Sequence, residues 1–204
     1  MRAPATLWII TLAHCLIVGN QATDPTGSAV LCTDSHAVFS HCTIADNTGG
    51  LQGAGLCLVN SNVILTNSIV WGNSPRAILA SGTNRPSITY TDVTGAWAGT
   101  GNIHSDPLFA GPGYWPSPND PAMTVAGTDT ATAWIEGDYH LRSGTGRWDP
   151  LTSTWVQDEL TSPCIDAGDP ASLVGYEPLP NGGVPNLGTY GGTTQASKSG
   201  LSGQ

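Results

Sequence analysis

Residues 41–47 read His41-Cys-Thr-Ile-Ala-Asp-Asn47, and this motif has two further copies in the first third of the chain. The copies are His14-Cys-Leu-Ile-Val-Gly-Asn20 and Asn67-Ser-Ile-Val-Trp-Gly-Asn73, so the motif recurs after 27 and then 26 residues. Strand-forming residues closed by Asn at such a period are typical of a solenoid, in which the chain winds through one coil after another. The motif therefore predicts an all-β parallel solenoid.

The repeat extends beyond the motif. Gly27-Ser-Ala-Val-Leu-Cys32 matches Gly53-Ala-Gly-Leu-Cys-Leu58 after 26 residues, which adds a second short strand to each coil. About four coils fit between residues 3 and 104, enough for neighbouring coils to bury one another. We expect the coils to occupy residues 1–94.

Stacked motifs predict ladders of like side chains. Period-two spacing sends Cys15 and Cys42 to one face of the sheet, which we take to be the interior. Neighbouring coils lie about 4.8 Å apart, which would permit a disulfide, but buried free thiols are favoured. Asn20, Asn47 and Asn73 are expected to stack at a corner, where Asn tolerates left-handed backbone angles and its amide bonds to adjacent turns. A ligand-binding Asn ladder is the less favoured alternative.

The repeat ends near Gly95. Residues 95–194 are rich in Gly and Pro turns and hold five of the seven Trp residues. We expect a loop-rich cap with a few short strands, packed over the C-terminal end of the solenoid, where it would prevent end-to-end association. Residues 195–204 are expected to form a flexible tail.

Composition argues against some classes of protein. The formal net charge is −9 with six basic residues and no basic stripe, which argues against nucleic-acid binding. No run reaches the ~18 apolar residues of a membrane span.

Residues 1–22 have two interpretations: a secretory signal, or the first coil, which is favoured because the motif accounts for the stretch. Only 10% of residues are charged, which suits a polar solenoid that is secreted or at the cell surface.

Seven further segments occur in a characteristic order. They are Asn67-Ser-Ile-Val-Trp-Gly-Asn73, Ile88-Thr-Tyr-Thr-Asp-Val93, Trp97-Ala-Gly-Thr-Gly-Asn-Ile103, Asp106-Pro-Leu-Phe109, Gly137-Asp-Tyr-His-Leu141, Ser162-Pro-Cys-Ile-Asp-Ala-Gly-Asp-Pro170 and Asn186-Leu-Gly-Thr-Tyr-Gly-Gly192. Together they resemble the C-terminal part of bacterial right-handed parallel β-helix proteins in the pectate-lyase-like superfamily. The resemblance implies the fold and an extracellular setting, but it does not choose between enzymes and non-catalytic surface proteins.

Catalytic motifs are absent from the solenoid. A lyase needs calcium held by carboxylates and a basic residue to remove a proton, but Asp24, Asp34 and Asp46 each stand alone on a coil. We therefore expect no cofactor and no metal site, although an acidic surface can hold calcium. A hydrolase needs two carboxylates. Candidate carboxylates are Asp92, Asp106, Glu136 and Asp138, with His140 nearby, but turn-forming roles are favoured for Asp106 and Asp138.

Aromatic residues of the second half are the candidate carbohydrate-binding groups. Sugar rings stack on exposed aromatic faces, and Trp97, Trp115, Trp148 and Tyr114 lie in probable loops. Anchoring of the loops to the solenoid is the favoured alternative for each ring. We predict a non-catalytic surface module with possible polysaccharide affinity. The alternatives are a C-terminal fragment of a polysaccharide lyase or glycoside hydrolase, indicated by a groove with two carboxylates and an Arg, and a purely structural stalk.

Overall fold

The computed structural model describes residues 9–22, 24, 27–50, 55–83, 85–117 and 133–200. Residues 1–8 of the expected signal segment or first coil, and residues 201–204 of the expected tail, lie outside these ranges. Within them the chain forms strands and turns but no helix, so the all-β prediction is confirmed. The described residues accordingly contain no helix suited to crossing a membrane.

Short strands follow the repeat through the first half of the chain. The solenoid strands are β1 (Ile9–Ala13), β2 (Leu16–Val18), β3 (Val30–Thr33), β4 (His36–Ser40), β5 (Thr43–Ala45), β6 (Leu56–Val59), β7 (Asn62–Trp71), β8 (Ile78–Ser81) and β9 (Ser87–Val93). The second half contributes β10 (Phe109–Gly111), β11 (Asp138–Leu141), β12 (Arg147–Asp149) and β13 (Thr154–Val156).

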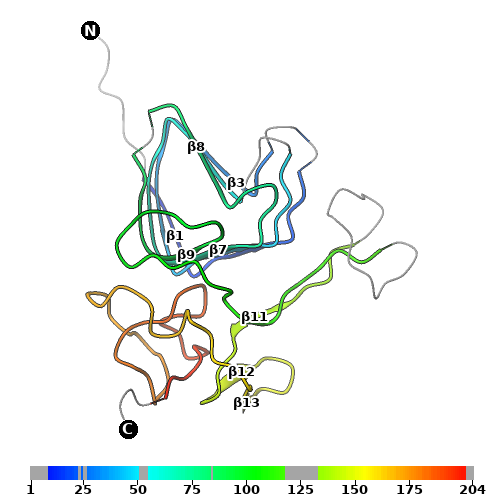
Figure 1. The fold of residues 1–204 in the computed structure, drawn as a ribbon, viewed down its shortest axis with the longest axis vertical. Coiled ribbons are helices and arrows are strands. Elements are labelled where there is room, and N and C mark those ends of the chain that lie inside the picture. The colour runs from blue at the N-terminus through cyan, green and yellow to red at the C-terminus, as the bar shows by residue number, and fades with distance from the viewer. Residues whose placement is uncertain are drawn as a thin grey trace.

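Successive repeats stack as parallel rungs, as the motif predicts. β1, β4, β7 and β9 pair in that order, the second half of β7 also pairs with β5, and β5 pairs with β2, which gives a six-stranded sheet. In this register Ile44 lies beside Ile17 on one side and Val70 on the other. β3, β6 and β8 form a second, three-stranded parallel sheet. Figure 1 shows the rungs nearly superposed.

Each rung turns at residues with left-handed backbone angles. Between the two strand segments of the six-stranded sheet these residues include His41 and Asn67, with φ of 51° and 50°. A small polar residue follows each one. Ser68 donates from Oγ to the Thr66 carbonyl at 2.7 Å, and Cys42 makes the corresponding thiol contact one rung earlier. The Cys/Ser column thus gives a second contact to carbonyls that already accept the His14 and His41 amides of the neighbouring rungs.

The Asn ladder forms at the corner after β2, β5 and β7. The side-chain amide of Asn20 donates to Asn47 Oδ1 at 2.9 Å, and that of Asn47 donates to Asn73 Oδ1 at 2.9 Å. The expectation of left-handed angles at these Asn residues is wrong, because the preceding residue makes the turn in each rung. Those residues are Gly19, Asp46 and Gly72. With the turn made one residue earlier, each Asn can direct its amide along the stack.

The solenoid interior is a continuous apolar column. Its fully buried members include Phe39, Ile44, Leu58 and Leu65, contributed by successive rungs and by both sheets. Trp97 packs against this cluster from the loop that follows β9. The same loop pairs with β9 through the Asp92–Ile103 bridge. Residues 94–103 therefore cover the C-terminal end of the core.

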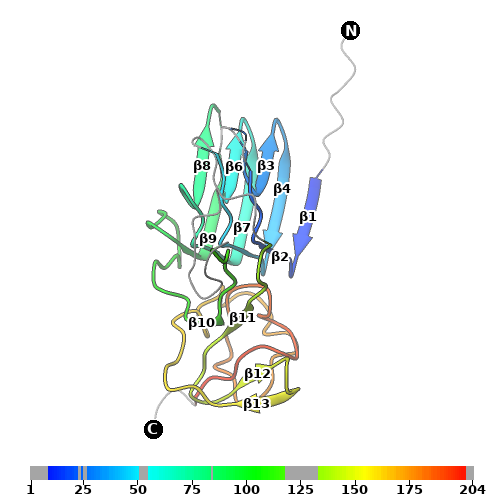
Figure 2. The ribbon, with the colours of Figure 1, turned by 90° about the vertical axis from the view of Figure 1, so that its right-hand side faces the viewer.

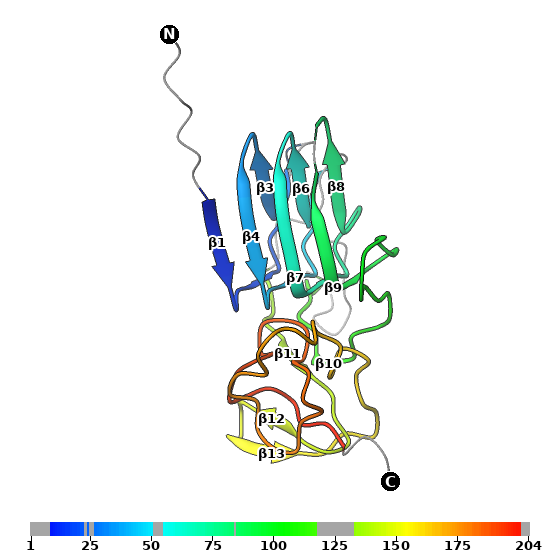
Figure 3. The ribbon, with the colours of Figure 1, turned by 90° about the vertical axis from the view of Figure 1, so that its left-hand side faces the viewer.

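Only the first residues of the expected cap, up to 103, lie over the C-terminal end of the solenoid, and the remainder lies beside it, which corrects our expectation. Figures 1 and 2 show residues after about 105 on one side of the solenoid, and Figure 3 shows them beneath the ends of β1, β4, β7 and β9. Contacts reach three rungs. The Thr189 carbonyl accepts from His14 Nδ1 at 3.2 Å, the Thr189 amide donates to Thr43 Oγ1, and the Gly188 amide donates to the Asn67 carbonyl.

A second apolar core joins the two halves. Ala45 and Ile69, which point outward from the six-stranded sheet, pack with Phe109, Tyr139 and Leu187 of the cap. The second half of this sheet is therefore buried on both faces, which explains why its strands are apolar without alternation. The outer face of β5 and β7 is the platform on which the cap and the candidate site are built.

Candidate functional site

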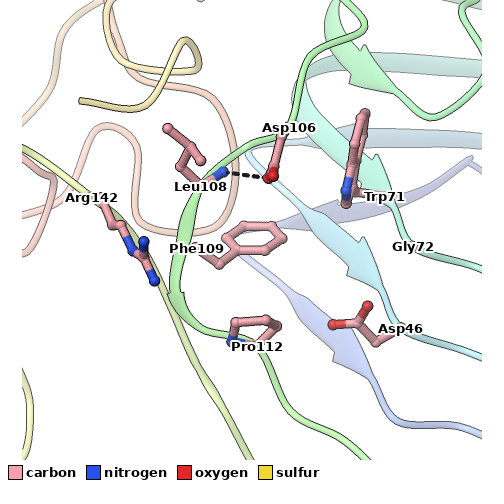
Figure 4. Close-up of a pocket in the computed structure, with 8 residues that line it drawn as sticks. All are labelled: Asp46, Trp71, Gly72, Asp106, Leu108, Phe109, Pro112 and Arg142. Atoms are coloured by element: carbon pink, nitrogen blue, oxygen red, sulfur yellow. Dashed lines mark hydrogen bonds between the residues drawn. The ribbon is translucent and has the colours of Figure 1, made fainter. Parts of the chain in front are cut away.

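A cavity lies where the solenoid meets the cap. Its volume is about 310 Å³. Its lining residues are Asp46, Trp71 and Gly72 from the solenoid, and Asp106, Leu108, Phe109, Pro112 and Arg142 from the cap. Figure 4 shows Asp46 and Trp71 on one side of this space, Arg142 on the other and Phe109 between them. The cavity exists only because the two halves are docked.

Asp46 is held in the cavity wall by the local backbone. It follows β5 with a left-handed φ of 54°, and its carboxylate lies over Gly72, where a Cβ atom would come within 2.4 Å of Oδ1. The Tyr139 hydroxyl donates to Asp46 Oδ2 at 2.7 Å and accepts from the Gly113 amide. Burial raises the pKa of the Asp46 carboxyl, and the hydrogen bond from Tyr139 opposes that rise.

The second carboxylate stands in a different environment. Asp106 is exposed, and its Oδ1 accepts the Leu108 amide at 2.9 Å, as Asp does when it opens a turn. The turn directs the chain into β10, which places Phe109 in the second core. Asp106 thus has the turn-forming role expected from the sequence and also lines the cavity.

Arg142 supplies the positive charge of the cavity. It follows β11, and its backbone amide donates to the Leu108 carbonyl at 3.0 Å, which fixes the base of the side chain. The guanidinium contacts the Ala110 carbonyl at 3.4 Å. No carboxylate in the described part of the chain forms an ion pair with it. Its planar array of donors is therefore left to a ligand or to water.

The aromatic walls complete the site. Trp71 ends β7 and packs half-buried against the second core. Phe109 is almost fully buried beside it. A half-buried indole, two carboxylates and a guanidinium can together contact an apolar ring face and hydrogen-bond to the hydroxyl groups around it. None of the solenoid residues of this cavity was singled out from the sequence as a ligand-binding group.

The aromatic residues predicted from the sequence are dispersed. Trp97 packs on the end of the solenoid core, and Trp148 packs edge-to-face against Trp155 in the β12–β13 hairpin. Trp115 packs edge-to-face against Trp134, which in turn lies against Gly19 of the first rung, and Tyr114 pairs with Ile135. The structure does not bring Trp97, Trp115, Trp148 and Tyr114 into one platform, and their carbohydrate-binding role stays a prediction.

The other predicted carboxylates lie outside the cavity. Asp92 is fully buried, where it accepts the Cys164 thiol at 3.2 Å. Asp138 contacts the His140 ring at 2.6 Å and accepts from Arg147 at 3.0 Å. Asp138 therefore bonds inside the cap, and Asp92 of β9 bonds from the solenoid to Cys164 of the cap.

The side chains of the predicted Cys and Asn ladders make their contacts within the solenoid. Cys15 and Cys42 are free thiols on the interior side, and the amide of Asn47 also donates to the Ile17 carbonyl at 2.9 Å. Within the described ranges, no three His, Cys, Asp or Glu residues are placed to hold a metal ion.

Two family models match separate parts of the chain. Residues 120–168 match a family model described as disaggregatase related. No curated protein and no solved structure gives a significant match. Residues 6–98 match the family model of the right-handed β-helix region, which covers the solenoid strands and the loop that carries Trp97. The first half of the chain is therefore a right-handed β-helix region.

Proposed function

We propose that this protein is a surface β-helix module that binds polysaccharide in the cavity between the β-helix and the cap. The carrying observation is the combination of Trp71, Asp46, Asp106 and Arg142 around one space of about 310 Å³. Within the described residues the Arg142 guanidinium forms no ion pair. That volume is at the lower end for ligand pockets, which suits a short part of a sugar chain better than a long stretch.

The chemistry of the lining fits a sugar. The C–H face of a pyranose ring packs on an indole, and its hydroxyl groups donate to carboxylates and accept from guanidinium donors. The preorganised position of Asp46, held by Gly72 and Tyr139, lowers the entropic cost of binding. A secreted or cell-surface setting in the pectate-lyase-like superfamily is part of this proposal, supported by the low charge content and by the family resemblance.

Binding is tested by retention of the purified protein on a panel of acidic and neutral polysaccharides, with and without calcium. We expect wild-type protein to be retained by at least one of them. Trp71→Ala and Arg142→Gln are each expected to weaken retention about tenfold or more. Arg76→Gln removes the same charge from an exposed position on the solenoid and should retain wild-type affinity. Equal retention of all variants would refute binding at this cavity.

Glycoside hydrolysis is the second candidate function, favoured by two carboxylates with different surroundings in one cavity. The half-buried Asp46, whose carboxyl pKa is raised by burial, suits a general acid, and the exposed Asp106 suits a base or nucleophile. Arg142 lines the same cavity. Two carboxylates and an Arg in one groove are the arrangement that we expected of an enzyme. Hydrolysis demands more than binding, because both carboxyl groups must reach the same glycosidic bond.

The same polysaccharide panel separates the two functions when new reducing ends are also measured. A hydrolase would release them, and Asp46→Asn would abolish release while leaving retention within a few-fold of wild type. Asp34→Asn, an exposed left-handed corner position, is the matched control. Retention without new chain ends would support the binding module alone. If the protein showed no retention and released no chain ends, the structural stalk would be favoured.

A further inference from the structure

The seam between cap and solenoid is closed by residues 186–192, which we call the clasp. Its Gly188 amide donates to the Asn67 carbonyl at 2.9 Å, and its Thr189 amide donates to Thr43 Oγ1 at 3.0 Å. The Thr189 carbonyl contacts the His14 ring at 3.2 Å. The clasp thus bonds to three successive rungs at the corner that carries the left-handed residues His14, His41 and Asn67.

His41 lies under the clasp with an unusual hydrogen-bonding state. Its Nδ1 atom contacts Ser40 Oγ at 3.0 Å. Its Nε2 atom is buried and has no hydrogen-bond partner in the described part of the chain. The ring stacks on His14 with centroids 5.0 Å apart, and it lies close beneath Gly191 of the clasp. The site has room for a neutral imidazole but offers no acceptor to a second N–H group.

No carboxylate compensates a charge at this position. From the first rung the facing titratable group is His14, which is also basic. From the cap it is Glu177, whose Oε1 accepts the amides of Asn186 and Gly192 and whose buried Oε2 has no hydrogen-bond partner in the described part of the chain. Neither oxygen lies within ion-pair distance of the His41 ring. Tyr190 turns away to stack on the His140 ring. Burial and the neighbouring His14 lower the pKa of His41 to about 4, so the closed clasp favours the neutral ring.

We propose that the stacked pair of His14 and His41 is an acid-sensitive latch: protonation of His41 releases the clasp and loosens the cap from the solenoid. A protonated His41 needs solvent for Nε2, and only an open clasp provides it. Because Asp106, Phe109 and Arg142 belong to the cap, opening also dismantles the cavity described above. The latch itself does not depend on what that cavity binds.

The sign of the effect follows from linkage. A lowered pKa in the closed state means that the open state binds more protons between pH 6.5 and about 4, so closure weakens as the pH falls through that window. After allowance for partial exposure of the pair, we expect clasp opening to increase roughly tenfold from pH 7.5 to pH 5.0. Buried carboxyl groups with raised pKa values, such as Glu177, take up protons more readily in the closed state, so their protonation strengthens closure as the pH falls.

The test measures hydrogen exchange of the Gly188 and Thr189 amides at pH 7.5 and 5.0, expressed as protection relative to intrinsic rates. Wild-type protein should lose about tenfold protection at these two amides, while amides of β4 and β7 keep theirs. In His41→Asn the loss should vanish. Asn occupies the same left-handed corner one rung later, so this variant keeps the backbone angle.

Two further arms keep the result unambiguous. Glu177→Gln should still show the tenfold loss, and an NMR titration of wild-type His41 should give a pKa well below 6.5. The latch is overturned if His41→Asn keeps the acid response, if Glu177→Gln abolishes it, or if His41 titrates near 6.5. The titration alone decides the matter if His41→Asn fails to fold. None of these readouts involves polysaccharide, so failure of the latch leaves the proposed binding function intact.

Discussion

At the scale of single residues, the fold depends on corners where one residue takes a left-handed backbone angle and the next satisfies the exposed polar groups. Asn47 is the central case, because its Oδ1 accepts from the backbone and the side chain of Asn20 while its own amide donates to Asn73 and Ile17. Every one of its side-chain hydrogen-bonding positions is used in a buried setting. Such networks are costly to break in part.

Asn47→Ala should destabilise the protein by about 2–4 kcal/mol, because it leaves buried groups on both neighbouring rungs without partners. Asn20→Ala, at the exposed end of the same ladder, should cost about 1 kcal/mol or less. Urea denaturation of the two variants gives the comparison. Equal losses would contradict a ladder whose strength lies in its buried centre.

Gly72→Ala should be more damaging than Gly95→Ala. Both glycines have positive φ values, 66° and 83°, so both variants share the cost of about 1–2 kcal/mol for a left-handed Ala. Only at Gly72 would the added Cβ meet a neighbour, since Asp46 Oδ1 would be 2.4 Å away, whereas nothing lies within 4 Å of Gly95. We expect an additional loss of stability and a displaced Asp46 in Gly72→Ala alone. The difference in unfolding free energy between the two variants measures this contact, and a difference near zero would contradict it.

At the scale of elements, strands β5 and β7 have two tasks. Their inner face fills the solenoid, and their outer face carries Ala45, Ile69 and Trp71 into contact with the cap. Tyr139 of β11 provides a polar link across this interface beside the cavity, in addition to the hydrogen bonds of the clasp. It is almost fully buried, and its hydroxyl joins Asp46 of the solenoid to Gly113 of the cap. The cavity is therefore anchored by one hydrogen-bonded bridge above an apolar interface.

Tyr139→Phe should lower stability by about 1–3 kcal/mol, because the Gly113 amide and the Asp46 carboxylate lose their partner in a buried setting. It should also weaken polysaccharide retention, since Asp46 loses the contact that fixes it. Tyr176→Phe, which removes a hydroxyl from a side chain that is 78% exposed, is the control. Thermal unfolding and polysaccharide retention are measured on both variants. Equal unfolding temperatures and equal retention of the two variants would contradict the bridge.

The motif of residues 41–47 was sufficient to predict the parallel rungs, their register and the inward-facing column of Ile44 and Val70. It could not predict the place of the cap, because the loop-rich half has no period that ties its segments to particular rungs. The unbroken apolar run in Ser68-Ile-Val-Trp71 was the available signal that both faces of β7 are covered. The same missing long-range information hid the cavity, whose members are separated by up to a hundred residues in the chain.

At the scale of the whole molecule, the cap and the solenoid share a core and should unfold together. Leu187 of the clasp is 1% exposed and packs in the core that contains Ala45 and Ile69. A lateral cap that bonds to successive rungs also ties those rungs to one another. This arrangement differs from an end cap, which would stabilise only the rung that it covers.

Leu187→Ala should destabilise the entire chain by about 2–5 kcal/mol, the usual range for a Leu truncated in a well-packed core. Far-UV circular dichroism, which follows the sheets, and Trp fluorescence, to which Trp115, Trp134, Trp148 and Trp155 of the cap contribute, should shift to the same lower denaturant midpoint. Leu173→Ala, at a position that is 89% exposed, should leave both midpoints unchanged. Two separated transitions would contradict a shared core.

The most direct measurement for the proposed function is hydrogen exchange of the protein with and without a polysaccharide from the panel that retains it. Binding at the cavity predicts increased protection at residues 71–72, 106–112 and 142, on both sides of the seam. Protection confined to the β12–β13 hairpin with Trp148 and Trp155, or retention by none of the polysaccharides, would contradict binding between the β-helix and its cap.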